Sequence, residues 1–98
     1  MTRDDAIIQI KAHADSVRDM GATSLYLFGS TARDVARPDS DLDLFIDYDP
    51  ESRFNGLDLV GIKRFLEDQL GTAVDVTTRD SLHPRLRARI ERSAVKVF

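Results

Sequence analysis

The 98-residue sequence contains no cysteine. Neither a disulfide framework nor a thiolate metal site can therefore exist. Long apolar runs are also missing, since none approaches the roughly 20 residues that a transmembrane helix needs. The first five residues, 1–5, are acidic and lack the apolar core of a signal peptide. We therefore expect a cytoplasmic protein with no membrane association.

The sequence also lacks an excess of basic residues, because it contains 14 Lys and Arg but 17 Asp and Glu, which gives a net charge of −3. Proteins that bind nucleic acid through its phosphates usually present a basic surface. One segment near the C-terminus is rich in arginine, at Arg85, Arg87, Arg89 and Arg92. No aromatic side chains alternate with these arginines to stack on bases. We interpret this segment as a solvated or partner-binding helix face and expect no strong direct binding of nucleic acid.

Apolar periodicity and turn residues divide the chain into alternating helices and strands. Apolar residues at three- and four-residue steps indicate amphipathic helices, and short runs bounded by Gly, Pro or Asp indicate strands. The expected helices are residues 4–19, 30–35, 56–70 and 84–92, and the expected strands are residues 24–28, 42–47, 72–77 and 94–98. A chain of this length and ordinary composition predicts one domain, residues 1–98, with a single core.

Two aspartates stand at the entrance of the second strand. Side chains alternate between the faces of a strand, so Asp41 and Asp43 share one face while Leu42 and Leu44 point toward the core. The two carboxylates lie about 7 Å apart along the strand and can share divalent cations. Mg²⁺ suits them because it is a hard ion that prefers oxygen, and two such ions could activate an attacking oxygen and stabilise a leaving pyrophosphate.

A Gly-Ser pair ends the first strand and supplies the other half of a site. Gly29 lets the backbone approach a ligand closely. Ser30 offers a hydroxyl and could cap the short segment that follows it, which would present N–H donors to an anion. Phosphate-binding donors opposite metal-binding carboxylates predict a complex of a metal with a nucleoside triphosphate.

These residues form a composite motif. Gly29-Ser30, then Ala32-Arg33, then residues 40–44 (Ser-Asp-Leu-Asp-Leu) resemble the signature of the polymerase-β-like nucleotidyltransferases. The small size resembles the minimal nucleotidyltransferase (MNT) branch, whose members are often paired with HEPN-domain proteins as toxin–antitoxin systems. The resemblance implies that Asp41 and Asp43 bind Mg²⁺ ions and that Gly29 and Ser30 contact the triphosphate of ATP.

Three further positions near this motif keep alternative interpretations. Arg33 could neutralise phosphate or could pair with Asp34 or Asp39. Ser40 could orient the metal-binding aspartates and thereby contribute to the nucleotide site, or it could cap locally. The family usually has glycine where this chain has Asp34, and an acid there could repel phosphates, strain a turn or simply face solvent.

Asp75 is the candidate third carboxylate, because it interrupts the apolar third strand. A strand parallel to the second would place Asp75 beside Asp43. By resemblance, Asp75 would bind the catalytic ion or accept the proton of the attacking hydroxyl. Asp47 and Asp80 are weaker alternatives, since Asp47 lies at the far end of its strand and Asp80 is expected to cap the last helix.

The predicted fold follows from bringing these residues together. Ser30 can meet Asp41 over a short connection if the first two strands are antiparallel. The second and third strands are joined by a long helix and should be parallel. We therefore expect an α/β (α+β) polymerase-β-like core, with a mixed sheet of three to four strands and helices packed mainly on one face.

The resemblance implies a specific activity for such a core. The protein would be an antitoxin that transfers AMP from Mg-ATP to a hydroxyl, in this branch a tyrosine, of a cognate HEPN-type toxin and so neutralises it. One alternative is a non-catalytic antitoxin that acts by steric complex formation. Another is a free-standing nucleotidyltransferase that acts on RNA or a small molecule.

Overall fold

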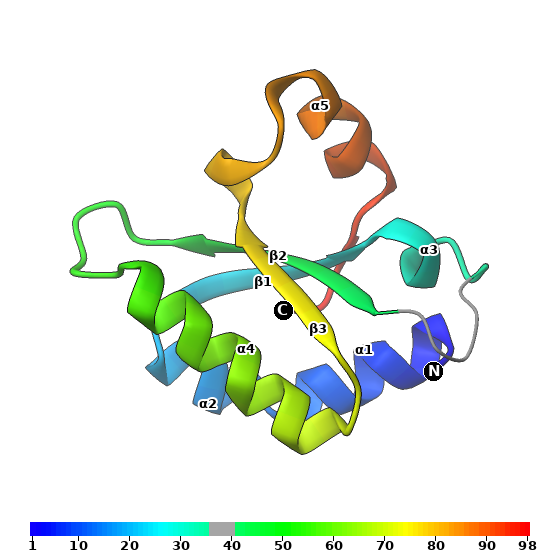
Figure 1. The fold of residues 1–98 in the computed structure, drawn as a ribbon, viewed down its shortest axis with the longest axis horizontal. Helices are drawn as coiled ribbons and strands as arrows, with labels where there is room; N and C mark the ends of the chain where they lie inside the picture. The colour runs from blue at the N-terminus through cyan, green and yellow to red at the C-terminus, as the bar shows by residue number, and fades with distance from the viewer. Residues whose placement is uncertain (36–40) are drawn as a thin grey trace.

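The computed structural model describes residues 1–35 and 41–98, and it shows helices and strands alternating along the chain (Figure 1). The helices are α1 (Arg3–Ala12), α2 (Ala14–Asp19), α3 (Gly29–Ala32), α4 (Gly56–Leu70) and α5 (Pro84–Ser93), with a 3₁₀ turn η1 (Arg79–Ser81). The strands are β1 (Ala22–Phe28), β2 (Leu42–Tyr48), β3 (Val74–Thr78) and β4 (Val95–Lys96). None of the helices in these two ranges has the length and apolar composition of a membrane span.

The strands form one mixed sheet in the order β3-β2-β1-β4. β1 runs antiparallel to both β2 and β4, and β2 runs parallel to β3. The predicted pairing directions and the mixed α/β fold are therefore confirmed. The long helix α4 makes the connection between the two parallel strands, as such a crossover requires.

The two faces of the sheet are covered differently. Helices α1, α2 and α4 lie on one side, over the apolar face, and α5 lies on the other side (Figure 1). The apolar face is fully buried at Leu25, Leu27, Leu44 and Ile46. Alternation along the strands places a polar and aromatic set on the α5 side: Tyr26, Phe28, Asp43, Phe45, Asp47 and Asp75. The candidate site lies on this second face.

Two local predictions are wrong. The single helix expected over residues 4–19 is two helices, because His13 leaves the helical conformation (φ −108°, ψ 14°). Ala14 and Val17 of α2 remain buried in the core, as the apolar periodicity predicted. Asp80 does not cap the last helix, since the ring Nδ1 of His83 accepts the N–H of Arg85 there, at 3.2 Å.

None of the residues of helix α5 is fully buried, and charged groups link this helix to the sheet. Arg79 donates Nε and Nη2 to the Asp47 carboxylate, at 2.8 and 3.0 Å, and Nη1 to Glu91 of α5, at 2.9 Å. Its guanidinium also lies 4.8 Å from the ring centre of Tyr26 and 4.9 Å from that of Phe45. The hydrogen bond to Asp47 is the main cause that raises the pKa of Arg79, so Arg79 remains charged where it links β2 to α5.

Candidate active site

Asp43 lies at the centre of the candidate site. In the strand register, it is opposite Phe28 of β1 on one side and beside Asp75 of β3 on the other. Paired strands are about 4.8 Å apart, so Asp43 and Asp75 are immediate neighbours. Asp41 stands two residues before Asp43 and is exposed. The tertiary structure therefore brings the predicted aspartates together at one edge of the sheet.

The electrostatics of this cluster suit a bound cation. Burial is the largest cause that raises the pKa of the Asp43 carboxyl, and the negative charges of Asp75 and then Asp41 raise it further. Within residues 1–35 and 41–98, no three His, Cys, Asp or Glu side chains have the geometry of a complete metal site. Mg²⁺ is usually bound by one or two carboxylates together with substrate phosphates. The aspartates therefore fit an ion whose coordination the substrate completes.

Gly29 makes a close approach that no other residue could make without rearrangement. Its backbone has φ +75°, in the left-handed region that favours glycine. A Cβ atom at this position would overlap the carboxylate oxygen Oδ2 of Asp43. The Gly-Ser turn therefore lies directly against the aspartate cluster, as the sequence predicted.

The predicted capping role of Ser30 is wrong. Helix α3 already begins at Gly29, its N-cap is Phe28, and no side chain caps it. Ser30 lies in the first turn, where its carbonyl oxygen accepts the N–H of Val35 at 3.0 Å. The helix begins one residue early because Gly29 can take the left-handed conformation between strand and helix.

The structure tests some of the interpretations offered for Arg33 and Asp34 but not those offered for Ser40. Arg33 ends α3 and is exposed, and it forms no ion pair with an acidic side chain of residues 1–35 or 41–98, so the pairing with Asp34 is absent. Asp34 has φ +58°, the conformation for which glycine is suited, and its carboxylate accepts the N–H of Arg3 at 3.3 Å. The alternative that an acid strains this turn is therefore supported. Ser40 and Asp39 lie outside the described residues.

A groove lies between α3 and α5, beside the Gly-Ser turn, and we call it the α3–α5 groove. It encloses about 250 Å³, and its lining includes Phe28, Gly29, Arg33, Leu86, Arg89 and Ile90. The sequence did not predict that Leu86, Arg89 and Ile90 line a groove next to this turn, because the arginine-rich helix was interpreted as a solvated or partner-binding face. The available signal was the i, i+4 spacing of Leu86 and Ile90 on a helix otherwise rich in arginine.

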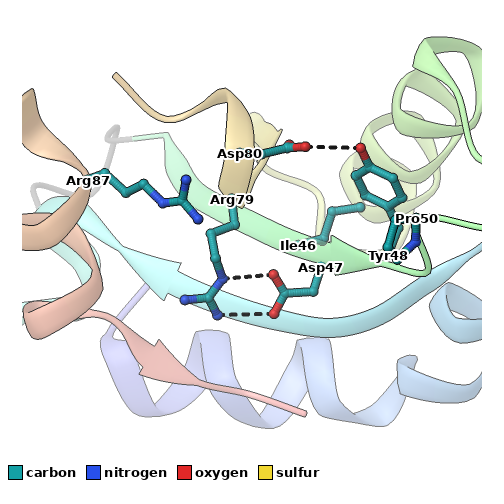
Figure 2. Close-up of a pocket in the computed structure, with 7 residues that line it drawn as sticks. All are labelled: Ile46, Asp47, Tyr48, Pro50, Arg79, Asp80 and Arg87. Atoms are coloured by element: carbon teal, nitrogen blue, oxygen red, sulfur yellow. Dashed lines mark hydrogen bonds and ion pairs between the residues drawn. The ribbon is translucent and has the colours of Figure 1, made fainter. Parts of the chain in front are cut away.

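A separate pocket of about 180 Å³ lies at the other end of β2 (Figure 2). Its charged groups already have partners: Asp47 with Arg79, and Asp80 with the hydroxyl of Tyr48, at 3.1 Å. Asp47 is four residues from Asp43, about 13 Å along the strand. Asp47 is therefore engaged in an ion pair and Asp80 in hydrogen bonds with hydroxyl groups, and neither belongs to the aspartate cluster.

Comparisons with known proteins show what this chain is similar to. The model of the nucleotidyltransferase domain family matches residues 10–97. A candidate protein adenylyltransferase of Methanocaldococcus jannaschii is 40% identical over 78 residues, which are 80% of this chain and 82% of that protein. The solved structure of a candidate minimal nucleotidyltransferase has a TM-score of 0.82 at 35% identity and covers 97% of this chain and 95% of that one.

A more distant likeness shows the fold alone. A chain from the solved complex of a tri-AMPylated Shewanella oneidensis HEPN toxin with an MNT antitoxin has a TM-score of 0.64 at 16% identity. The match covers 90% of this chain and 68% of that chain.

Proposed function

Because the chain belongs to the nucleotidyltransferase domain family, we propose that it transfers AMP from ATP to a hydroxyl group of a protein and releases pyrophosphate. The observation that carries this proposal is the contact of the Gly29 backbone with Asp43, which itself pairs with Asp75. The 40% identity to a candidate protein adenylyltransferase supports a protein as the acceptor.

Each residue of the site has a role in this proposal. Gly29 leaves room for phosphates beside Asp43, the Ser30 hydroxyl donates a hydrogen bond to a phosphate oxygen, and Arg33 neutralises phosphate charge. Asp41, Asp43 and Asp75 would hold two Mg²⁺ ions, which neutralise the triphosphate and make the acceptor hydroxyl more acidic. The crowding of negative charge around Asp43 supports this assignment, since cations relieve it.

The transfer itself is a single displacement at the α-phosphorus. The acceptor oxygen forms a bond to the α-phosphorus while the bond to the oxygen that bridges the β-phosphate breaks, and pyrophosphate leaves with the electron pair. The hydroxyl proton passes to the Asp75 carboxylate, which then releases it to solvent. Even a tyrosine hydroxyl, with a pKa of about 10, is protonated near neutral pH, so a base at this position is useful.

The acceptor we propose is a tyrosine of a HEPN-type toxin, so that the chain acts as an antitoxin. The fold likeness to a chain of the complex between an MNT antitoxin and an AMPylated HEPN toxin supports this choice. Inhibition of the toxin without modification would instead indicate an antitoxin that acts by steric complex formation. Turnover of ATP on RNA or a small molecule, without a protein partner, would indicate a free-standing enzyme.

The test is mass spectrometry of the partner protein co-expressed with the chain, looking for added AMP. Asp75→Asn should retain the melting temperature and lose transfer by about 10²–10⁴-fold, the usual effect of removing a general base. Asp68→Asn, at an exposed aspartate of α4, is the matched control and should transfer normally. Near-normal transfer by Asp75→Asn would contradict the role of Asp75, and an unmodified partner in the wild type would contradict the activity.

A further inference from the structure

Strand β3 lies at one edge of the sheet, with β2 as its neighbour on the other side. The pairing with β2 decides which backbone groups of β3 face outward. The N–H of Leu42 donates to the carbonyl oxygen of Ala73 at 3.0 Å, so alternate residues from Ala73 onward direct their backbone groups toward β2. Val74, Val76 and Thr78 therefore direct their backbone N–H groups toward the outer edge.

This outer edge is closed where β3 begins and open farther along. At Val74, the side chain of Lys63 donates to the carbonyl oxygen at 2.8 Å, and the carboxylate of Glu67 accepts the N–H at 3.0 Å. Among residues 1–35 and 41–98, no group bonds to the N–H or C=O of Val76 or to the N–H of Thr78. Backbone groups exposed in this way on an edge strand are a template for pairing with another chain. We call this part of β3, Val76 to Thr78, the open edge.

We propose that the open edge binds an extended segment of the acceptor protein as an added strand, an inference that rests on the proposed function. The open edge begins directly after Asp75, which receives the hydroxyl proton in that proposal. Asp75 is exposed, and its side chain lies on the α5 side of the sheet. A residue of the added strand opposite Asp75 directs its side chain to the same face. An acceptor hydroxyl on that residue therefore arrives beside Asp75.

The spacing of strands favours tyrosine over serine in this segment. Neighbouring strands are about 4.8 Å apart, so an added strand lies about 9.6 Å from β2, where Asp43 stands. A serine side chain is too short to cross β3, whereas an aromatic side chain reaches diagonal neighbours about 7–8 Å away. A tyrosine of the added strand can therefore carry its hydroxyl across Asp75 toward Asp43.

The surface beside the open edge suits an apolar, extended segment. Helix α4 runs alongside β3 (Figure 1), and its residue Val60 is 43% exposed. Val60 lies three residues before Lys63, on the stripe of α4 that faces the edge. The adjacent Leu59 lines a pocket of about 240 Å³ together with Phe54 and Thr78. Since side chains alternate along a strand, one face of the added strand can contact these groups while the other presents the hydroxyl.

Two variants block the open edge without altering the aspartates. Val76→Pro removes an outward N–H, and proline is tolerated where an edge strand turns its N–H to solvent. Val60→Lys places a charge beside the edge, which opposes strand pairing, and it decides the question if proline unfolds β3. Both should keep the wild-type Kd for Mg-ATP in calorimetry and lower transfer to the co-expressed partner about tenfold, as the loss of one or two hydrogen bonds would. Ile8→Lys, at an exposed isoleucine of α1, is the matched control and should transfer normally.

Hydrogen exchange followed by NMR tests the pairing directly. On addition of the partner, the amide protons of Val76 and Thr78 should exchange more slowly, because they become hydrogen-bonded to the added strand. The amide proton of Val74 should change less, since it is already bonded to Glu67.

The contrary results are distinct. Normal transfer by Val60→Lys and a folded Val76→Pro, or unchanged exchange at Val76 and Thr78, would overturn the added strand and leave the proposed function standing. A dimer of this chain that Val76→Pro dissociates in analytical ultracentrifugation would also overturn it, because a second copy would then occupy the open edge. A partner left unmodified by the wild type would overturn the proposed function and the inference with it.

Discussion

Replacing Arg79 with alanine should detach α5 from the sheet. Arg79 joins Asp47 of β2 to Glu91 of α5 and covers the rings of Tyr26 and Phe45. Since α5 itself has no fully buried residue, these contacts contribute to holding this helix against the sheet. The α3–α5 groove depends on the position of α5, so the variant should also change the shape of this groove.

The magnitude follows from the geometry of the contacts. Hydrogen bonds to charged groups contribute about 1.5–3 kcal/mol, and a guanidinium over an aromatic ring about 0.5–2 kcal/mol. The side chains of Arg79 and Asp47 are 25% and 32% exposed, so solvent screens part of this energy. We expect a loss of about 2–3 kcal/mol in the free energy of unfolding. For a domain of this size, such a loss lowers the melting temperature by about 10–20 °C.

Urea denaturation and thermal melting, both followed by circular dichroism, measure this loss. Arg64→Ala, at an exposed arginine of α4, is the matched control and should change the free energy of unfolding by less than about 0.5 kcal/mol. Arg79→Lys should lie between the two, because an ammonium cannot reproduce the bidentate contact with Asp47. A double-mutant cycle with Asp47→Ala isolates the pair itself.

Two results would refute this reasoning. Arg79→Ala could prove as stable as Arg64→Ala, which would mean that the ion pairs contribute nothing measurable. The cycle with Asp47 could also give a coupling energy near zero, which would assign the loss to packing on the rings.

Three further predictions concern the site and the pH dependence. Gly29→Ala should abolish most AMP transfer in the mass-spectrometric assay, because a Cβ would displace the Asp43 carboxylate. Gly56→Ala is the control and should transfer normally, since a Cβ at Gly56 meets nothing within 4 Å. Asp43→Asn should raise the melting temperature at pH 7 and abolish transfer. Burial, and then neighbouring negative charge, raises the pKa of the Asp43 carboxyl, so its ionised form destabilises the fold at pH 7. A lower melting temperature of the variant would contradict this. Hydrogen bonds from the N–H of Val74 and from Lys63 lower the pKa of Glu67 below its ordinary value of 4.5. In urea denaturation across a pH series, the wild type should therefore lose stability as the pH falls below about 4.5, and Glu67→Gln should lose less. Parallel curves for the two proteins would show that ionised Glu67 does not stabilise the fold.

The secondary structure and the strand pairing were largely predictable, because they depend on local patterns. The periodicity of α4 is bounded by Asn55 and Gly71, whose capping preferences mark its two ends correctly. The short connection from β1 to β2 and the long one from β2 to β3 gave the correct strand directions. The errors at His13, Ser30 and Asp80 all concern the ends of helices, where one or two hydrogen bonds decide the conformation.

The candidate site was only partly predictable. Asp41 and Asp43 share a strand face by alternation alone, and Gly29 precedes them in the motif on which the resemblance was based. The proximity of Asp75 needed the parallel pairing of β2 with β3, which the crossover rule supplied. The α3–α5 groove could not be predicted, because its two walls lie more than 50 residues apart and meet only in three dimensions.

The sequence by itself determined the order of the elements, the two-faced character of the strands and the candidate aspartates, since each follows from short-range periodicity and the direction of side chains. Only the tertiary structure decided where α5 lies, because its attachment depends on Arg79 meeting Asp47 and Glu91 from three separate elements. The tertiary structure also decided that Asp47 is structural, since its partner Arg79 lies 32 residues away, and it gave Asp80 a second partner, Tyr48, at the same separation. Such long-range pairing leaves no periodic trace in the sequence.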